Sequence, residues 1–509
     1  MFENQPKALY ALALANTGER FGYYTMIAVF TLFLRANFGL SSGTAGLIYG
    51  VFLALVYFLP LVGGIMADKF GYGKMVTIGI IVMFAGYLFL SIPLGGGVMG
   101  YAAMFGALLL VSLGTGLFKG NLQVMVGNLY DAPELSAKRD SGFSIFYMAI
   151  NIGALFAPTA AVRIKEWAEH ALGYSGNDAY HFSFAVACVS LIVSMMIYYA
   201  FRSTFKHVEA GAGKSKKTDT AGTEEELTPQ QTKERIVALC LVFAVVIFFW
   251  MSFHQNGLTL TFFADEFVSP KSEGVQTMAF DVINLVMIIF MIYSLMSVFQ
   301  SKTSKAKLIS TVVFLAAVGV LVYKYHNIGG PVDVSAPIFQ QFNPFYVVAL
   351  TPVSMAIFGA LAAKGKEPTA PRKIAYGMII AGSAYLLMVL ASRGLLTPNE
   401  QAAAKAAGET VPFASGNWLI GTYLILTFGE LLLSPMGISF VSKVAPPKYK
   451  GTMMGGWFVA TAIGNLLVSV GGFLWNDIPL TIVWSVFIVL CLLSAGFMFL
   501  MMKRLEKVA

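Results

Sequence analysis

The chain has 509 residues, of which 57% are hydrophobic and only 12% are charged. Soluble domains carry about 25% charged residues, so this composition excludes an ordinary soluble protein and predicts many transmembrane segments. The net charge of +8 comes from Lys and Arg residues scattered through short connecting segments, without a basic stripe beside exposed aromatic residues, so we expect no nucleic-acid partner.

The three cysteines, Cys188, Cys240 and Cys491, all lie within apolar runs. This placement excludes a disulfide framework and a CxxC metal or redox motif. The histidines in loops and at span edges show no metal-ligand spacing, so neither a metal nor a cofactor is expected. The first apolar run is far longer than the core of a signal peptide, so we expect no cleavable signal sequence.

Fourteen predominantly apolar runs have about the 20 residues that a helix needs to cross roughly 30 Å of hydrocarbon. They lie near residues 8–35, 44–66, 75–94, 100–128, 141–162, 181–201, 235–262, 283–300, 308–325, 344–363, 374–393, 417–442, 451–474 and 480–502. The sequence therefore predicts an all-α polytopic membrane protein with 14 transmembrane helices.

Basic residues are distributed unevenly between the two sides of the membrane. With a cytoplasmic N-terminus, the inner loops hold 25 Lys and Arg residues and the outer loops hold four. Cytoplasmic loops normally carry the excess of Lys and Arg. We therefore predict that both termini are cytoplasmic, and we place the chain in the inner membrane of a bacterial cell.

Five ionisable side chains lie deep within apolar runs, namely Glu19, Arg20, Lys119, His254 and Glu430. A charged side chain at the centre of a membrane helix costs about 2.5 to 3.5 kcal/mol, so such residues normally face a water-filled cavity, a partner charge or a substrate. The pattern predicts a protein that moves something charged across a membrane.

The first span carries Arg20, Tyr23 and Tyr24 at positions i, i+3 and i+4, which places a guanidinium and two phenols on one helix face. Arg is suited to bidentate binding of a carboxylate. The alternative is an internal ion pair between Glu19 and Arg20. Adjacent residues point about 100° apart on a helix, so we expect them to share a face poorly and to need a third partner.

The loop between the second and third spans, residues 63–74, reads GGIMADKFGYGK. Its glycines permit close helix approach and a tight turn, while Asp68 can pair with a helix end or with a basic residue such as Lys69 or Lys74. This pattern resembles the signature loop of the major facilitator superfamily, which latches the inner gate. The alternative is an ordinary loop that is basic for topological reasons.

Six spans precede residues 203–234, a segment rich in Gly, Lys, Thr and Glu, and eight follow it. Such a composition cannot bury enough apolar surface to order itself, so we predict a flexible cytoplasmic linker. It ends in Thr228-Pro229-Gln230-Gln231, a helix start with a capping box. The predicted domains are an N-terminal six-helix bundle at 1–202 and a C-terminal bundle at 235–509, which includes an inserted hairpin at about 283–325.

Several motifs occur in order along both halves of the chain. They are ERFGYY at 19–24, GLFKGN around Lys119, RDSGFSIFYMAINIG at 139–153, FFW, HQ and FFAD between 248 and 265, Asn343-Pro344, and GELLLSP at 429–435. Together they resemble the proton-dependent oligopeptide transporter family of the major facilitator superfamily, whose fold is two six-helix bundles. The FYxxINxG and GELxxSP patterns are highly specific.

The resemblance implies a role for each matching position. Residues matching the family's cationic groups for a peptide C-terminal carboxylate are Arg20 and Lys119, and those matching its binding groups for the N-terminal ammonium are Asn151, Asn343 and Glu430. Pocket tyrosines are matched by Tyr23, Tyr24 and Tyr57, and the aromatic lining by Trp250 and Trp457. A zwitterion needs one cationic and one anionic pole, so this assignment agrees with the chemistry of the buried charges.

Three positions depart from the family pattern. Asn16 replaces the leading acid of ExxER, His254 replaces the acid of the seventh span, and Gly120 stands where the family has Pro. The first two changes remove carboxylates that take part in proton coupling in typical members. We therefore expect His254 and Glu430, with Glu19 as a third candidate, to carry the proton. The alternative for His254 is a neutral hydrogen-bonding residue of the pocket, because Arg20 and Lys119 favour its neutral form.

The predicted function is import of di- and tripeptides by alternating access, with small peptides, protons and the lipid bilayer as partners and a monomeric state. A same-fold transporter of another small zwitterion or anion, and uncoupled peptide transport, are the alternatives. A membrane-embedded sensor or enzyme is disfavoured, because the sequence shows no nucleophile with a base, no metal-ligand spacing, no phosphate loop and no soluble output domain.

Overall fold

The computed structural model describes residues 5–136, 138–210, 227–446 and 449–508. Its α-helices are α1 (Lys7–Phe38), α2 (Ser42–Phe70), α3 (Tyr72–Leu90), α4 (Val98–Asn128), α5 (Pro133–Ser136), α6 (Arg139–Leu172), α7 (Tyr180–Ala200), α8 (Pro229–Phe253), α9 (Thr259–Glu266), α10 (Val275–Phe280), α11 (Val282–Gln300), α12 (Ser304–His326), α13 (Phe342–Ala363), α14 (Ala370–Ala391), α15 (Pro398–Ala406), α16 (Gly416–Val444), α17 (Lys450–Leu467), α18 (Ser469–Phe473) and α19 (Leu480–Val508). The 3-10 helices are η1 (Arg202–Thr204), η2 (Lys206–Val208), η3 (His254–Gly257) and η4 (Ala336–Gln341). Two short strands, β1 (Lys271–Ser272) and β2 (Val332–Asp333), pair antiparallel.

Thirteen segments of the described chain are long and apolar enough to cross a membrane. This confirms the prediction of an all-α polytopic membrane protein, and most helix bounds lie within a few residues of the predicted ones. Helix α1 is not among the thirteen. Its 32 residues suffice to span a bilayer, but Glu19 and Arg20 interrupt its apolar sequence. The fourteenth span therefore stays a prediction.

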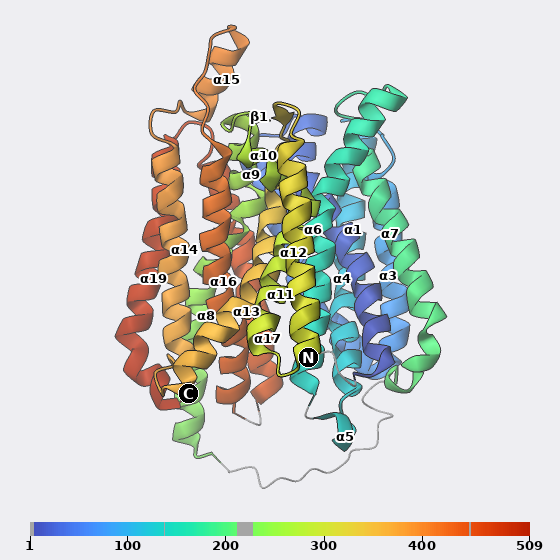
Figure 1. Ribbon diagram of the computed structural model, residues 1–509, viewed down its shortest axis with the longest axis vertical. Helices are drawn as coiled ribbons and strands as arrows, with labels where there is room; N and C mark the ends of the chain where they lie inside the picture. Colours follow the sequence, from blue (N-terminus) through green and yellow to red (C-terminus); the bar gives the residue numbers. More distant parts are fainter. Residues whose placement is uncertain (1–4, 137, 211–226, 447–448, 509) are drawn as a thin grey trace. The chain divides into compact units, whose positions relative to one another are not determined.

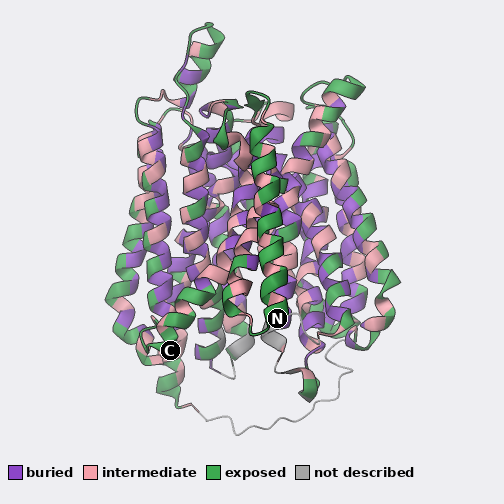
Figure 2. Cartoon of the chain, in the orientation of Figure 1, coloured by how far each residue is buried: buried purple, intermediate pink, exposed green. Residues whose placement is uncertain are grey.

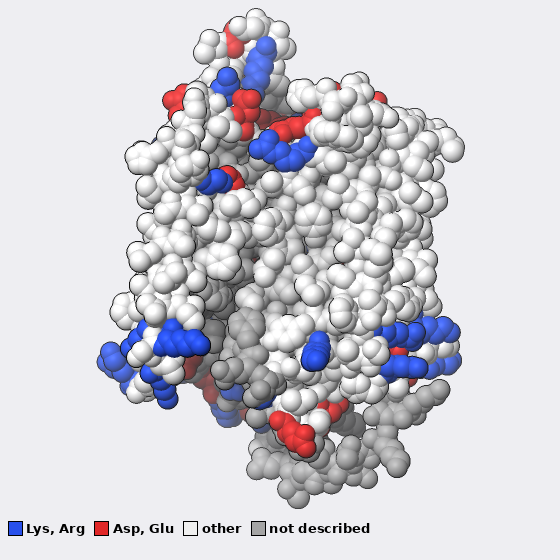
Figure 3. All heavy atoms as spheres, turned by 45° about the vertical axis from the view of Figure 1, so that its right-hand side comes forward, with Lys and Arg blue, Asp and Glu red and all other residues white. Residues whose placement is uncertain are grey.

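Charged side chains gather near the ends of the helices. Figure 3 shows that the lateral surface between these ends carries almost no Lys, Arg, Asp or Glu on the face in view. Exposed apolar residues such as Leu109, Val189, Ile192 and Met196 lie along this surface instead. Such a band matches the hydrocarbon layer, where charged side chains are costly.

The described residues cluster by contacts into two compact units. Unit 1 comprises residues 1–254, 437–473 and 503–509, and unit 2 comprises 255–436 and 474–502. Helix α16 therefore contributes residues to both units. The two units are defined by the contacts between residues. The predicted division into two sequence halves on either side of the linker stays a prediction. Within unit 1, α1 packs along α6 and α7, and α4 packs along α2 and α3 (Figure 1).

Glycines allow the helices of unit 1 to approach closely. A Cβ atom on Gly79 of α3 would lie 2.7 Å from the carbonyl oxygen of Gly114 on α4. A Cβ atom on Gly63 of α2 would lie 2.1 Å from the carbonyl oxygen of Gly116, also on α4. In both cases an added Cβ atom would meet a backbone carbonyl oxygen, which no change of side-chain rotamer can move away. Small residues at helix crossings are the usual means of close packing in membranes.

Helix α8 begins where the sequence predicts a capped start. The Thr228 hydroxyl accepts a hydrogen bond from the backbone of Gln231, whose side chain bonds back to the Thr228 backbone, so the capping box is confirmed. The helix starts at Pro229, six residues before the span predicted from hydropathy. The centre of the predicted linker, residues 211–226, lies outside the described residues.

The first part of the predicted linker is folded against α3. The Glu209 carboxylate accepts hydrogen bonds from the Arg202 guanidinium at 2.8 Å and from the Tyr198 hydroxyl at 3.0 Å. Its backbone carbonyl accepts a hydrogen bond from Gly73 at 3.2 Å. The pair with Glu209 raises the pKa of Arg202. The predicted flexible linker therefore cannot begin before residue 210.

Helices α11 and α12 of unit 2 form the predicted hairpin, since they pack against each other. Figure 2 shows α12 exposed along most of its length, and Ala317 is its one buried residue. Lys324 near its end pairs with Asp281, the N-cap residue of α11. A helix that is apolar and exposed on nearly all sides is suited to contact with lipid.

Candidate functional site

Glu19 and Arg20 form a buried ion pair on α1. Arg20 donates from Nε to Glu19 Oε2 and from Nη2 to Glu19 Oε1, each at 2.5 Å, and the two side chains are 3% and 0% exposed. The expectation that these adjacent residues share a face too poorly to pair is wrong. Both side chains are long enough to converge beyond the helix surface, so the bidentate geometry of Arg overrides the difference in direction of their Cβ atoms.

The two predicted pocket tyrosines of α1 lie beside this pair. The Arg20 guanidinium carbon lies 4.6 Å from the centre of the Tyr23 ring, which favours a cation–π interaction. Tyr23 meets Tyr24 edge to face, with ring centroids 5.2 Å apart. Tyr23 is buried and Tyr24 is half-buried. The predicted face of a guanidinium and two phenols is thus present, with Glu19 added to it.

Lys119 of α4 lies over the ring of Tyr57 from α2. Its Nζ atom is 4.3 Å from the ring centroid. The close approach of Gly116 to Leu59, two residues beyond Tyr57, brings these helices together at this level. Among the residues that the structure describes, Lys119 takes part in no ion pair. Arg20 and Glu19 act on it electrostatically, so unit 1 holds one paired and one unpaired cation at membrane depth.

His254 stands where α8 ends. The sequence predicts a span over 235–262, and the structure has one candidate span there, Pro229–Glu266. Within it, α8 ends at Phe253 and η3 follows before α9 begins. The polar sequence His-Gln-Asn-Gly occupies the break. The imidazole stacks on Trp250, with centroids 5.2 Å apart and planes at 20°, and lies 6.0 Å from the Tyr57 ring. A broken transmembrane helix is a common place for a binding site.

Unit 2 contributes a separate polar cluster around Glu430 of α16. Asn343 of α13 donates from Nδ2 to Glu430 Oε2 at 2.9 Å and to the Thr427 hydroxyl at 3.0 Å. Glu430 is 9% exposed. No basic side chain pairs with it within the described part of unit 2. The amide therefore holds a carboxylate in place without neutralising it.

Two further predicted residues, Asn151 and Trp457, are buried in unit 1. Asn151 of α6 donates from Nδ2 to the carbonyl of Tyr147, one turn earlier in the same helix, at 3.1 Å. The indole of Trp457 on α17 packs so tightly over Gly437 that a Cβ there would lie 2.0 Å from its ring.

The predicted gate loop joins α2 to α3 in unit 1. Asp68 accepts a hydrogen bond from the Tyr72 hydroxyl at 2.6 Å. Lys69 and Lys74 lie over the ring of Phe70, at 5.5 Å and 5.9 Å. The chain turns at Gly71, whose φ of 99° favours glycine. These contacts order the loop, and its role as a gate latch stays a prediction.

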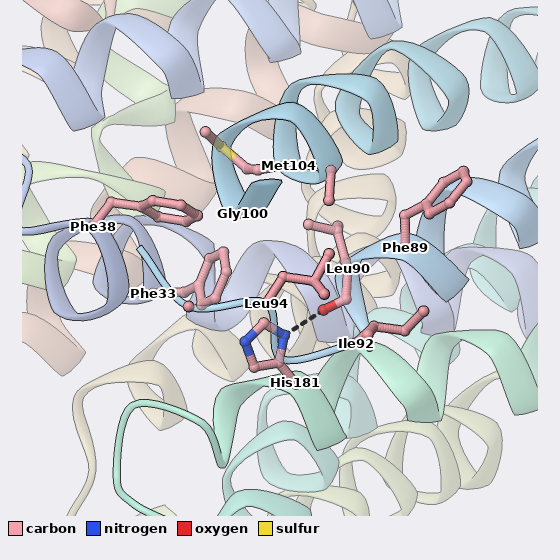
Figure 4. Close-up of a pocket in the computed structure, with 11 residues that line it drawn as sticks. Phe33, Phe38, Phe89, Leu90, Ile92, Leu94, Gly100, Met104 and His181 are labelled. Atoms are coloured by element: carbon pink, nitrogen blue, oxygen red, sulfur yellow. Dashed lines mark hydrogen bonds between the residues drawn. The ribbon is translucent and has the colours of Figure 1, made fainter. Parts of the chain in front are cut away.

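A small pocket of unit 1 lies between the ends of α1, α3, α4 and α7, and is lined largely by apolar residues (Figure 4). His181 is its polar member. Its Nδ1 atom donates to the carbonyl of Leu90 at 2.5 Å, which leaves Nε2 to accept from Asn37 at 3.3 Å. The free space, about 10 Å³, is close to the minimum for one water molecule. Both ring nitrogens of His181 are thus used in hydrogen bonds within unit 1, which favours a structural role for this residue.

The predicted residues fall into two groups by unit. Unit 1 brings together Glu19, Arg20, Tyr23 and Tyr24 on α1, and places Tyr57, Lys119, Trp250 and His254 in contact along α2, α4 and α8. Unit 2 brings together Asn343 and Glu430. Sequence reasoning missed Thr427, a polar residue one turn before Glu430, and Asn465, a polar residue within an apolar span. The signal that could have found Thr427 is its spacing from Glu430, and that for Asn465 is its spacing from Trp457, because each spacing places the two residues on one helix face.

The sequence profile of the POT family matches residues 73–222 and 325–483, which together make up more than half of the chain. The chain belongs to the POT family. Dipeptide and tripeptide permease B of Xenorhabdus bovienii is 27% identical over 481 residues, covering 92% of this chain and 86% of the permease. The di-/tripeptide transporter of Lactococcus lactis subsp. cremoris is 28% identical over 495 residues, with 92% and 89% covered.

Solved structures of POT proteins share the fold. A peptide transporter POT in complex with sulfate superposes with a TM-score of 0.73 at 22% identity, covering 100% of this chain and 96% of that one. A POT family transporter in complex with 5-aminolevulinic acid gives a TM-score of 0.73 at 20% identity, with 100% and 98% covered. The chain is therefore a polytopic membrane protein homologous to bacterial di-/tripeptide transporters.

Proposed function

We propose that this POT protein imports di- and tripeptides by alternating access, and that the transport is coupled to protons through His254 and Glu430. The observation that carries the proposal is the charge of the two half-sites. Unit 1 holds Lys119 without an acidic partner, and unit 2 holds Glu430 without a basic one, among the residues described. A zwitterion supplies the two missing partners.

Lys119 is the residue proposed to bind the peptide carboxylate. The Lys119 ammonium lies over the face of the Tyr57 ring. This contact uses no conventional hydrogen-bond acceptor, so the N–H donors of Lys119 are left for a ligand. Arg20 is bound to Glu19 through two nitrogen atoms, so we assign the primary contact with the carboxylate to Lys119. Tyr23 and Tyr24 line the same face of α1.

Glu430 is the residue proposed to bind the peptide ammonium. Asn343 fixes one of its carboxylate oxygens, and the other remains to accept from a ligand. The names of the relatives, a dipeptide and tripeptide permease and a di-/tripeptide transporter, support peptides as the substrate class. Recognition through the two peptide termini would leave the peptide side chains free to vary.

The second candidate function is transport of another small zwitterion or anion. Asn16 and His254 favour it, because both stand where typical members have a carboxylate. Competition separates the candidates. Dipeptides of varied side chains should displace a labelled dipeptide, and a blocked carboxyl terminus should abolish the displacement. If varied dipeptides fail to compete and the blocked terminus makes no difference, the peptide assignment is wrong.

Counterflow of a labelled dipeptide in proteoliposomes tests transport and coupling separately. We expect counterflow to proceed without a pH gradient, and accumulation against a concentration gradient to require one. The His254→Glu variant, which restores the acid of typical members, should keep gradient-driven accumulation. Accumulation that persists unchanged after the pH gradient is collapsed would contradict coupling and leave uncoupled transport. Binding without flux would instead indicate a sensor.

A further inference from the structure

We infer that Asn465 of α17 is a positioning residue for His254, which hydrogen-bonds the imidazole in both of its protonation states. Asn465 is fully buried at 0% exposure and lies next to His254 in unit 1. The inference rests on the proposed function for its consequence in transport, but the contact itself does not depend on the substrate.

Close packing of three helices brings Asn465 to this position. A Cβ atom on its neighbour Gly464 would lie 2.5 Å from the carbonyl oxygen of Ile247 and 3.0 Å from Cβ of Trp250, both on α8. On the other side, a Cβ atom on Gly50 of α2 would lie 3.0 Å from the backbone oxygen of Asn465. Asn465 therefore lies on the part of α17 that packs closely against both α2 and α8, at the level of Trp250.

The polar atoms at this point are buried without partners. Within the part of the chain that the structure describes, neither Nδ2 nor Oδ1 of Asn465 forms a hydrogen bond, and Nδ1 of His254 and Nε1 of Trp250 form none either. Buried polar groups in native proteins are normally hydrogen-bonded, so a cluster of unpaired atoms requires an explanation. The Asn465 amide interacts electrostatically with the imidazole, although no hydrogen bond of good geometry joins the two side chains. A small rotation of either side chain completes the pair.

The chemistry of an amide suits a titrating imidazole. A neutral imidazole with an unprotonated Nδ1 accepts from the amide NH₂ group, whereas a protonated Nδ1 donates to the amide oxygen. Asn465 can serve both states by turning its amide over. A carboxylate in this position would accept only, and would hold the imidazole in its charged form.

The other groups facing His254 do not duplicate this role. The titratable and charged side chains from the packed helices are Lys119 of α4, which repels an imidazolium, and Tyr57 of α2. Trp250 stacks on the ring from α8. The Tyr57 hydroxyl also carries a donor and an acceptor, but its ring centroid lies 6.0 Å from that of the imidazole. Among the described residues of unit 1, Asn465 is the amide side chain that acts on the imidazole.

The stacking of Trp250 on His254 supplies a direct readout. A protonated imidazole quenches the fluorescence of a stacked indole, so the fluorescence of purified protein without substrate reports the charge of His254. The difference between wild type and Trp250→Phe isolates this tryptophan from the other five of the chain's six. Titration from about pH 4 to about pH 9 should show a step that is absent in His254→Gln.

Two variants of Asn465 test its role. Asn465→Asp should move the midpoint of the step to higher pH by about one unit or more, because an adjacent carboxylate favours the charged imidazole. Asn465→Leu should move it to lower pH, because the amide oxygen no longer accepts from the protonated ring. The pH profile of dipeptide uptake should shift in the same two directions, and these shifts should vanish in the His254→Gln background.

Ser469→Ala is the matched control. Ser469 lies one turn beyond Asn465 and bonds the carbonyl of Leu466, so its replacement should leave the midpoint unchanged. Unshifted midpoints in both Asn465 variants, an equal shift in Ser469→Ala, or no step in wild type would each overturn the inference. A shifted fluorescence midpoint in protein that transports no peptide would preserve this inference and refute the proposed function instead.

Discussion

Arg20 and Glu19 are neighbours in the chain and form a two-point ion pair at 2.5 Å, so the guanidinium is already neutralised at membrane depth. Lys119, which lies over Tyr57, forms no ion pair among the residues that the structure describes. The two cations that the family resemblance assigns to one role are therefore in different electrostatic situations. This difference makes their substitutions distinguishable.

Lys119→Gln should reduce dipeptide uptake at least about 30-fold while leaving the protein folded. Loss of one partner of a buried charge pair costs about 2 to 5 kcal/mol in binding. In Lys119→Gln the substrate carboxylate would lose the ammonium that pairs with it in the proposal. Lys119→Arg should retain part of the activity because the charge remains. Uptake in proteoliposomes, normalised to folded protein by size-exclusion chromatography, measures both. Normal uptake by Lys119→Gln would remove this residue from the site.

Glu19→Gln should destabilise the fold by about 3 to 5 kcal/mol, because it leaves the buried Arg20 charge without its partner. Thermal unfolding in detergent measures the effect. The exposed pair of Arg163 with Glu166, whose side chains are 73% and 36% exposed, offers a control, and Glu166→Gln should change stability by at most about 1 kcal/mol. Equal stability of both variants would show that the pair on α1 is not structural.

Glu430→Gln should abolish dipeptide binding, since the ammonium of the substrate would lose its only acidic partner in the proposal. Asn343→Ala should weaken binding less, because it removes the group that holds the carboxylate rather than the carboxylate itself. Thr427→Val should weaken it least, as Thr427 contacts Asn343. Isothermal titration with a dipeptide ranks the three variants. A reversed order would exclude Glu430 as the ammonium site.

Gly464→Ala should sharply reduce the yield of folded protein. Its Cβ would lie 2.5 Å from the backbone oxygen of Ile247, so α17 and α8 would have to separate. Gly319 of α12 is the matched control, because a Cβ there meets no atom within 4 Å. Gly319→Ala should leave the yield unchanged or stabilise the helix by up to about 1 kcal/mol. Fluorescence-detected size-exclusion chromatography compares the two.

The helix bounds were largely predictable because local patterns specify them. Apolar runs of about 20 residues mark the spans, and the capping box at Thr228 marks the start of α8. The helix break at His254 was not predicted, since the apolar residues on both sides hide three polar residues and a glycine in a hydropathy average. The extension of α6 to Leu172 was missed for the opposite reason, because its polar end lies beyond the apolar run.

The residues of the candidate site were predictable by type, because a charge within a membrane span needs a reason to be there. Which of these side chains pair with one another was not predictable from the sequence. Whether Arg20 binds Glu19 or a ligand depends on how two long side chains converge, and the position of Asn465 depends on the close contact of Gly464 with α8.

The sequence alone determined that this protein is a many-helix membrane protein with buried charges, because hydropathy and charge act locally along the chain. The tertiary structure decided which buried charges are neutralised and which remain open, because the outcome depends on how side chains converge, within α1 for Arg20 and Glu19 and between helices for Asn343 and Glu430. Among the described residues of unit 1, Lys119 has no acidic ion-pair partner and His254 has an amide neighbour.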